Sequence, residues 1–257
     1  MFGAGGRMGS TVCGAVAADP DLSLVAAIDP HHAGLDARAV TGAEVSGLQV
    51  VPEAAGLDGS TVDVAVDFTD AAAARRNLRW CAEEGVHAVV GTTGLSEKDI
   101  DELTKRFTSS NCLIAPNFAI GAVLMMRFAE LAAPYFETAE IIELHHDGKV
   151  DAPSGTAMLT AQRMAAASPD WAPDPTKDEV VAGARGGAGP AGIHVHAVRL
   201  RGLVAHQEVL LGTTGQSLTI RHDSYDRSSF MPGVLMAVKR IADRPGLTVG
   251  LDALLGL

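Results

Sequence analysis

Short apolar segments that alternate with helical patterns constrain the fold of the first half of this chain. Two of the intervals, residues 70–85 and 96–110, begin with the helix-capping residues Asp70 and Ser96 and continue with good helix formers. Parallel strands that follow one another need helical crossovers of this kind, so the pattern predicts a doubly wound α/β sheet. The segments that read as strands are LSLVAAID (22–29), DVAVDFT (63–69), HAVVGTT (87–93) and CLIAPN (112–117).

The pattern changes after residue 116, where the sequence predicts an α+β unit. Residues 169–192 are rich in Pro, Gly and Ala and are expected to form a long surface loop. A final helix at 228–243 has Pro232 in its first turns and is expected to pack back on the first domain. The other expected elements are helices at 121–136 and 154–168, a strand at 139–147, and an antiparallel run of strands at 193–203, 205–212 and 216–224, the last two joined at TTG.

The composition limits the partners of the chain. Its net charge is −11, from 20 Lys+Arg and 31 Asp+Glu, which argues against nucleic acid or an anionic membrane as the main partner. A bound anion must therefore be held by a local cluster. There is no apolar run long enough to cross a membrane and no signal peptide, so we expect a cytoplasmic protein. Cys13, Cys81 and Cys112 form no C-x-x-C pair, which indicates reduced thiols and no metal site.

The segment GAGGRMG (3–9) is a G-x-x-G-x-x-G motif near the start of the chain. Glycine permits a tight turn and lets backbone N–H groups approach a pyrophosphate at a helix N-terminus. Asp29 lies 20 residues after Gly9, at the end of the next predicted strand, where a carboxylate accepts hydrogen bonds from the adenosine ribose. The loop and Asp29 together predict that this domain binds a dinucleotide.

The choice between NADH and NADPH stays open at this point. Asp29 favours NADH because its carboxylate repels a 2′-phosphate. Arg7, His31 and His32 could offset that repulsion, so use of NADPH stays open.

Two further strand ends are expected to belong to the same crevice. GTTG (91–94) ends one predicted strand and APNF (115–118) ends the next. Ligands of open α/β sheets bind beyond the carboxyl ends of the strands. Both segments are therefore expected to face the nicotinamide half of a bound dinucleotide.

The densest polar cluster is LHHDGKVDAPSGTA (144–157). Either Asp151 or Ser154 can cap the helix that begins there, and the backbone N–H groups of Gly155 and Thr156 would then point out of its positive end. Lys149 adds a mobile positive charge beside them. The cluster therefore predicts a carboxylate-binding site.

His145 and His146 are adjacent, so on a strand they point to opposite faces. This argues against a metal ion held by both. A histidine titrates near neutrality and can give a proton during a reduction, so one of the two is expected to work in the cleft.

These motifs make the chain resemble the bacterial 4-hydroxy-tetrahydrodipicolinate reductases, and among them the actinobacterial members. GAGGRMG, VDFT, GTTG, APNFAIG and HHxxKxDxPSGTA occur in the family's order. The resemblance implies a Rossmann-type dinucleotide-binding domain at 1–116 with 227–257. It also implies a substrate-binding and oligomerisation domain at 117–226, whose mixed sheet builds a homotetramer.

The resemblance also implies residue roles. His145 corresponds to the catalytic acid/base and Lys149 to a second proton donor. The implied substrate contacts are His146, Ser154, Gly155 and Thr156. The implied contacts to NADH or NADPH are Gly3, Ala4, Gly5, Gly6, Arg7, Met8, Asp29, Gly91, Thr92, Thr93, Ala115, Pro116, Asn117 and Phe118.

The implied reaction reduces (2S,4S)-4-hydroxy-2,3,4,5-tetrahydrodipicolinate to tetrahydrodipicolinate, with loss of water, in diaminopimelate and lysine biosynthesis. Two alternatives are weighed against it. An aspartate- or amino-acid-type NAD(P) dehydrogenase with the same two-domain plan would not need HHxxKxDxPSGTA, so this motif argues against it. A non-catalytic NAD-binding sensor predicts a missing proton donor or anion site, whereas His145 and Lys149 are both present.

Only Met1 and Phe2 precede the glycine loop, although a central parallel strand normally has about five residues. The sequence therefore predicts a first strand that is cut short. We expect the natural start to lie a few residues upstream.

Overall fold

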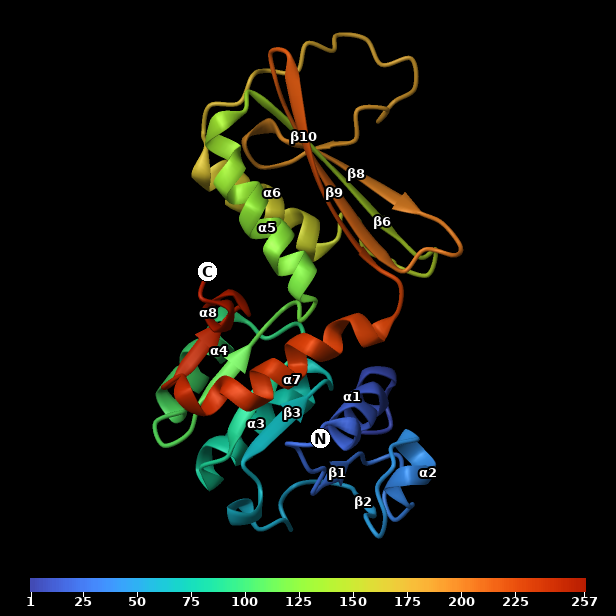
Figure 1. Ribbon diagram of the computed structural model, residues 1–257, viewed down its shortest axis with the longest axis vertical. Helices are drawn as coiled ribbons and strands as arrows, with labels where there is room; N and C mark the ends of the chain where they lie inside the picture. Colours follow the sequence, from blue (N-terminus) through green and yellow to red (C-terminus); the bar gives the residue numbers. More distant parts are fainter. The chain divides into compact units, whose positions relative to one another are not determined.

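The computed structural model describes residues 1–257 as two compact units (Figure 1). One unit is formed by Met1–Phe118 with Phe230–Leu257, and the other by Ala119–Ser229. The chain thus leaves the first unit once and returns to it near its end. The boundaries expected from the sequence, after residues 116 and 226, lie a few residues earlier.

The first unit contains the predicted parallel sheet. Its strands lie in the order β11-β5-β4-β3, and every pair among them is parallel. β1 (Ala27–Ile28) and β2 (Val50–Val51) form a separate parallel pair. Phe2 joins the two groups, because it pairs in parallel with both Ile28 and Asp67. The bounds of the larger group are β3 (Val64–Asp67), β4 (His87–Val90), β5 (Cys112–Ile114) and β11 (Leu247–Val249).

The strand expected at 22–29 is much shorter than predicted, since only Ala27–Ile28 is extended in a ladder. A strand needs hydrogen-bonding neighbours, and Met1 and Phe2 are the residues that pair with this segment on one side. Ile28 donates its N–H to the Met1 carbonyl over 2.8 Å, and Gly3 donates to the Ile28 carbonyl over 2.8 Å. The first strand of the sheet is therefore reduced to a bridge at Phe2.

Two helices of the first unit, α3 and α4, begin where their capping residues predict. Asp70 accepts hydrogen bonds from the N–H groups of Ala72 and Ala73, and Ser96 forms a capping box with Asp99. The last long helix, α7, has a proline in its first turn and contacts both α1 and β4, so it packs back on the first unit as expected. The bounds are α1 (Arg7–Ala18), α2 (Ala37–Thr41), α3 (Ala71–Glu84), α4 (Glu97–Arg106), α7 (Met231–Arg240) and α8 (Asp252–Leu255).

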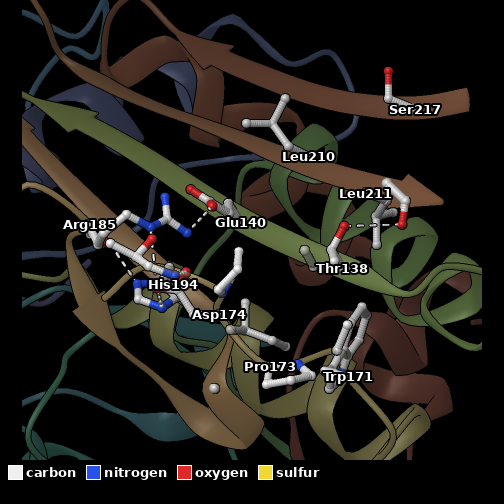
Figure 2. Close-up of a pocket in the computed structure, with 17 residues that line it drawn as sticks. Thr138, Glu140, Trp171, Pro173, Asp174, Arg185, His194, Leu210, Leu211 and Ser217 are labelled. Atoms are coloured by element: carbon white, nitrogen blue, oxygen red, sulfur yellow. Dashed lines mark hydrogen bonds and ion pairs between the residues drawn. The ribbon is translucent and has the colours of Figure 1, made fainter. Parts of the chain in front are cut away.

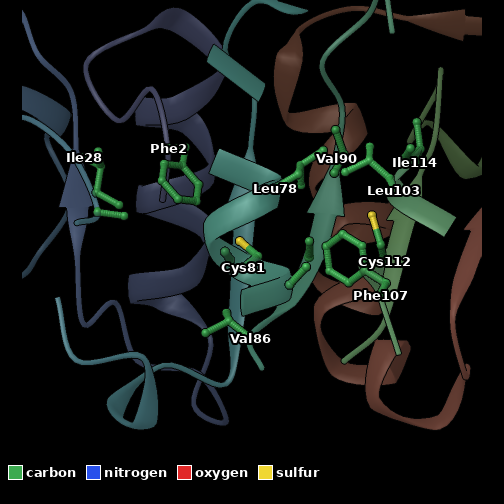
Figure 3. Packing of buried hydrophobic residues seen from close by; sticks show 14 residues of the cluster. Phe2, Ile28, Leu78, Cys81, Val86, Val90, Leu103, Phe107, Cys112 and Ile114 are labelled. Carbon is green, nitrogen blue, oxygen red and sulfur yellow. The ribbon is translucent and has the colours of Figure 1, made fainter. Parts of the chain in front are cut away.

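The core of the first unit lies between the sheet and its helices (Figure 3). Phe2 is buried in it and meets Trp80 edge to face, with ring centroids 6.1 Å apart. Cys81 and Cys112 belong to the same cluster and are free thiols. Burial raises the pKa of Cys81 to about 12, so this thiol stays protonated.

The second unit has a mixed sheet in the order β10-β9-β6-β8-β7. The expected antiparallel run of the last three strands is wrong for β8, which pairs in parallel with β6 instead of lying beside β9. The reason is the connection: α6 (Gly155–Ala167) lies between β6 and β8 in the chain, and such helical crossovers join parallel strands. The strands are β6 (Thr138–His145), β7 (Gly187–Ala188), β8 (His194–Arg199), β9 (Ala205–Thr213) and β10 (Gln216–Ser224).

Two helices cover one face of this sheet, α5 (Ile120–Ala132) and α6 (Gly155–Ala167) (Figure 1). The helix expected at 121–136 ends earlier because Pro134 lacks an N–H and the chain continues as a short 3₁₀ turn. Most of the expected loop at 169–192 has no regular structure. No helix of either unit is long and apolar enough to span a bilayer.

Two glycines of α1 give a matched test of the loop that precedes it. A Cβ on Gly9 would lie 1.9 Å from the Gly3 carbonyl oxygen, whereas a Cβ on Gly14 would meet nothing within 4 Å. Gly9→Ala is therefore expected to destabilise the protein by about 1–3 kcal/mol. Gly14→Ala is expected to stabilise it by about 0.5–1 kcal/mol, through helix propensity.

Urea unfolding followed by the fluorescence of Trp80 measures both changes. Trp171 is the other tryptophan of the chain, so a Trp171→Phe background isolates the signal of the first unit. Equal stabilities of the two alanine variants would contradict the close approach of Gly9 to Gly3.

Candidate functional site

The glycine motif forms a tight loop between Phe2 and α1. Gly3 has φ +72°, which glycine adopts without strain, and its carbonyl accepts the Gly6 N–H over 3.0 Å. Gly6 is the N-cap of α1 and provides no side-chain cap. The close approach of Gly9 to Gly3 completes the turn. The loop thus brings the N-terminus of a twelve-residue helix to the carboxyl end of the sheet.

Asp29 follows β1 and ties the glycine loop to the end of that strand. Its carboxylate accepts the Gly5 N–H over 3.0 Å, the His31 N–H over 2.9 Å and the His32 Nδ1 at 3.0 Å. Burial raises the pKa of Asp29, but these hydrogen bonds outweigh burial and hold the pKa below its ordinary value. The carboxylate is therefore ionised beside the loop.

The segment after β3 brings the ends of the neighbouring strands together. The Asp67 carboxylate is buried and accepts hydrogen bonds from Thr69, from Thr92 Oγ1 over 2.7 Å and from Asn77 Nδ2 over 2.7 Å. The Phe68 ring lies so close to Gly91 that a Cβ there would come within 2.0 Å of it. Asp67 and Phe68 both belong to the sequence motif VDFT, yet neither was predicted as a site residue.

The remaining predicted coenzyme residues lie around this junction. Phe118 is buried, and its ring is 5.7 Å from that of Phe68, centroid to centroid. Ala115 donates its N–H to the Val90 carbonyl over 2.9 Å, whereas Thr93 and Pro116 are exposed. The structure therefore brings GTT and APNF together at the ends of β4 and β5.

The polar cluster of the second unit is built on a buried carboxylate. Glu143 lies on β6 two residues before His145, so both side chains leave the same face of the sheet. Its Oε2 is 2.6 Å from His145 Nδ1, and its Oε1 accepts the Ser154 N–H over 3.0 Å. Arg199, at the end of β8, donates one hydrogen bond of 2.8 Å to each oxygen.

Glu143 and Arg199 were missed by the sequence reasoning. Glu143 is fully buried, and a buried charged residue signals a partner. The sequence places the glutamate two residues before His145, but nothing in it identifies Arg199, 56 residues further on, as the partner.

Lys149 and Asp151 form an ion pair close to this cluster. Lys149 Nζ is 2.7 and 2.8 Å from the two carboxylate oxygens of Asp151, and this hydrogen bonding lowers the pKa of Asp151. Asp151 therefore does not cap α6. Ser154 does, because its Oγ accepts the Ala157 N–H over 3.2 Å.

The start of α6 leaves room for a ligand at one position. A Cβ added to Gly155 would meet nothing within 4 Å, whereas the side chain of Ser154 is buried. Thr156 follows in the first turn, and His146 lies just beyond the end of β6. His145, Lys149 and the start of α6 are thus gathered within one segment of the second unit.

Burial lowers the pKa of His145 below its ordinary value. The Glu143 carboxylate acts in the opposite direction, while Lys149 and Arg199 lower the pKa further. The imidazole is therefore neutral near pH 7. Throughout the 257 residues, no group of three or more His, Cys, Asp or Glu side chains is arranged to hold a metal ion.

Two cavities lie away from these clusters. One, of about 550 Å³, lies on the sheet of the second unit beside Glu140, Trp171 and His194 (Figure 2). The other, of about 590 Å³, lies in the first unit beside Phe2 and Trp80. Neither cavity is lined by a predicted catalytic or substrate-binding residue, and the glycine loop lines neither.

The Thr92 hydroxyl can be tested as the link between the ends of β3 and β4. It donates to Asp67 Oδ1 and accepts the Thr69 N–H over 2.8 Å. Thr92→Val keeps the shape but removes both bonds, so we expect a loss of about 1–3 kcal/mol. Thr93→Val is the matched control, because Thr93 is exposed. Urea unfolding measures both, and equal stabilities would contradict the link.

The chain is similar to proteins of one family along its whole length. Residues 1–118 match the family model described as "Dihydrodipicolinate reductase, N-terminus", and residues 121–255 match "Dihydrodipicolinate reductase, C-terminus". It is 51% identical over 264 residues to the 4-hydroxy-tetrahydrodipicolinate reductase of Cutibacterium acnes. It is also 51% identical over 264 residues to that of Nocardia farcinica, and both matches cover 100% of this chain and 98% of the relative.

Solved structures show the same similarity. The dipicolinate-bound dihydrodipicolinate reductase from Paenisporosarcina sp. TG-14 is 39% identical, with a TM-score of 0.86 over 98% of this chain and 97% of that one. An amine dehydrogenase from Mycobacterium smegmatis shares the fold, with a TM-score of 0.63 at 16% identity. The chain belongs to the dihydrodipicolinate reductase family.

Proposed function

We propose that this protein is a 4-hydroxy-tetrahydrodipicolinate reductase. It reduces (2S,4S)-4-hydroxy-2,3,4,5-tetrahydrodipicolinate to tetrahydrodipicolinate with NADH or NADPH and with loss of water, in diaminopimelate and lysine biosynthesis. The observation that carries the proposal is the cluster of His145, Lys149 and the start of α6 in the second unit. Family membership and the reductase names of the full-length relatives support it.

The first unit fits a nicotinamide dinucleotide. Gly5 and Gly9 stand where a Cβ would strike His32 or the Gly3 carbonyl, so only glycine permits this tight turn. The turn precedes the N-terminus of α1, the kind of helix end that favours a pyrophosphate. The bound coenzyme would supply a hydride. The residues proposed to hold it are Gly3, Ala4, Gly5, Gly6, Arg7, Met8, Asp29, Gly91, Thr92, Thr93, Ala115, Pro116, Asn117 and Phe118.

The second unit is proposed to bind the cyclic dicarboxylate. The start of α6 at Ser154, Gly155 and Thr156 has the positive end of a thirteen-residue helix, which favours a carboxylate. His146 is proposed as a further contact to the substrate. The relative from Paenisporosarcina is described as bound to dipicolinate, which is itself a cyclic dicarboxylate.

Two side chains are proposed to handle protons. Hydride addition with loss of water consumes one proton, which must come from the protein or from solvent. Lys149 is proposed as a donor, held by Asp151 until the substrate carboxylate competes for its ammonium group. His145 is proposed as the acid/base, and its neutral ring can take up and return a proton.

We further propose a homotetramer in the cytoplasm. The family resemblance supports the assembly, and β10 supports it independently. This strand is nine residues long, lies at the edge of the sheet, and has mostly exposed side chains. A long unpaired edge is a surface that another copy can cover.

A coupled assay tests the activity. Pyruvate and aspartate semialdehyde are supplied with the upstream synthase, and oxidation of NADH or NADPH is followed by absorbance. We expect Lys149→Ala to lower turnover by about 10²-fold or more, the usual scale of proton-transfer catalysis, while NADH still binds. Lys177→Ala is the control, because Lys177 lies exposed in the long loop.

The outcomes separate the alternatives. Near-normal turnover in Lys149→Ala would refute the role of the lysine. A wild-type protein that binds NADH in a fluorescence titration but oxidises neither coenzyme would refute the reductase and favour a sensor.

Asp29 is expected to set coenzyme preference. Its ionised carboxylate repels a 2′-phosphate, so we expect the wild-type protein to have the higher kcat/KM with NADH. Asp29→Asn should raise the ratio of kcat/KM for NADPH to that for NADH by about tenfold, corresponding to about 1.4 kcal/mol. Glu53→Gln, an exposed residue near β2, is the control. An unchanged ratio in Asp29→Asn would contradict the assignment.

A further inference from the structure

We propose that Glu143 is a positioning residue for this reaction. Its one buried carboxylate holds both the His145 ring and Ser154, the N-cap of α6. The inference rests on the proposed function, in which His145 moves a proton and the start of α6 binds a carboxylate. Glu143 itself is fully buried. It acts through the two groups that its oxygens hold.

The contacts of Glu143 use each carboxylate oxygen twice. Oε2 meets His145 Nδ1 at 2.6 Å and one Arg199 nitrogen at 2.8 Å. Oε1 meets the Ser154 N–H at 3.0 Å and the second Arg199 nitrogen at 2.8 Å. A side chain held by four donors, with none of its surface exposed, has a single orientation. It can therefore transmit a fixed geometry to both partners.

The carboxylate also selects the tautomer of His145. Burial raises the pKa of Glu143, but Arg199 and His145 outweigh burial and keep the pKa below its ordinary value. An ionised carboxylate only accepts hydrogen bonds, so the neutral ring must carry its proton on Nδ1. Nε2 then has the free lone pair, and it is the nitrogen that we assign to the proton transfer.

The same carboxylate fixes the loop between the strand and the helix. The loop runs from His146 to Ser154, the N-cap of α6. Glu143 holds both of its ends, through the ring of His145 before the loop and through the Ser154 N–H at its last residue. Arg199 adds a bond of 2.7 Å to the Asp151 carbonyl in the middle of the loop. The position of His145 Nε2 is therefore coupled to the position of the helix start. Under the proposed function these two groups act on different parts of one substrate.

A second glutamate on the same strand provides a natural comparison. Glu140 also pairs with an arginine and a histidine, Arg185 at 2.5 Å and His196 at 2.7 Å. It lies on the opposite face of β6, since it is three residues from Glu143. It has the same chemistry without contact to His145 or to Ser154, so it is the matched control.

The charged groups that face His145 are Glu143 on the same strand, Arg199 at the end of β8 and Lys149 in the loop. Glu143 alone raises the pKa of the imidazole, while the two cations lower it. Removal of the carboxylate charge in Glu143→Gln is therefore expected to lower the pKa of His145 further. Removal of the Glu140 charge should leave it unchanged.

The experiment compares Glu143→Gln with Glu140→Gln in the full-length protein. Diethyl pyrocarbonate modifies neutral imidazole, and peptide mass spectrometry can follow His145 separately from His146 without any turnover. For Glu143→Gln we expect the midpoint of the rate-against-pH curve to move to lower pH by about one unit, the scale of a close charge pair. In the coupled assay we expect kcat to fall at least tenfold and the KM for the dicarboxylate to rise, with the KM for NADH unchanged.

A Glu143→Gln protein with a wild-type modification curve and wild-type kinetics would overturn the proposal, as would an equal shift in Glu140→Gln. Should Glu143→Gln not fold, Arg199→Lys serves instead. This variant keeps the positive charge but loses the paired hydrogen bonds to Glu143. We expect its kcat to fall, while its KM for NADH changes less. If the wild-type protein has no reductase activity but Glu143→Gln still shifts the modification curve of His145, the proposed function is refuted. The positioning of His145 by Glu143 would then still stand.

Discussion

A carboxylate taken out of water must be met by donors, and this constraint organises the functional regions of the protein. Asp29, Asp67 and Glu143 each lie at or near the carboxyl end of a strand and are almost fully buried. The donors to Asp29 and Asp67 come from the loops and helices beyond the strands, and Glu143 is met by Ser154 before α6 and by His145 and Arg199 at the ends of β6 and β8. Each carboxylate therefore joins a strand end to a loop that the sheet alone would not hold.

The three carboxylates differ in what they join. Asp29 binds the Gly5 backbone and so attaches the glycine loop to β1. Asp67 binds Thr92 and so attaches the end of β3 to the end of β4. Glu143 binds His145 and Ser154, which places a titratable ring beside a helix N-terminus. In each case the interaction sets the geometry of a loop that is proposed to contact a ligand.

Much of the architecture could be predicted, because local chemistry determines it. Asp70 and Ser96 mark helix starts through side-chain caps that need only neighbouring residues. The family was identified correctly from HHxxKxDxPSGTA and the other motifs, since their spacing is a property of the sequence. The order of the second sheet was not predicted. Whether β8 pairs with β6 or with β9 depends on competition for strand edges, which no local pattern records.

The sequence by itself determined where α3, α4 and α6 begin, which segments form β3 to β6 and β8 to β10, and which residue types gather in the glycine loop and in the cluster at 144–157. These properties follow from capping, periodicity and spacing along the chain. Only the tertiary structure decided that Asp151 pairs with Lys149 while Ser154 caps α6, and that Arg199 reaches Glu143 from another strand. The physical reason for the Arg199 contact is that the buried charge of Glu143 takes its partner from whichever element lies beside it in space, regardless of distance along the chain.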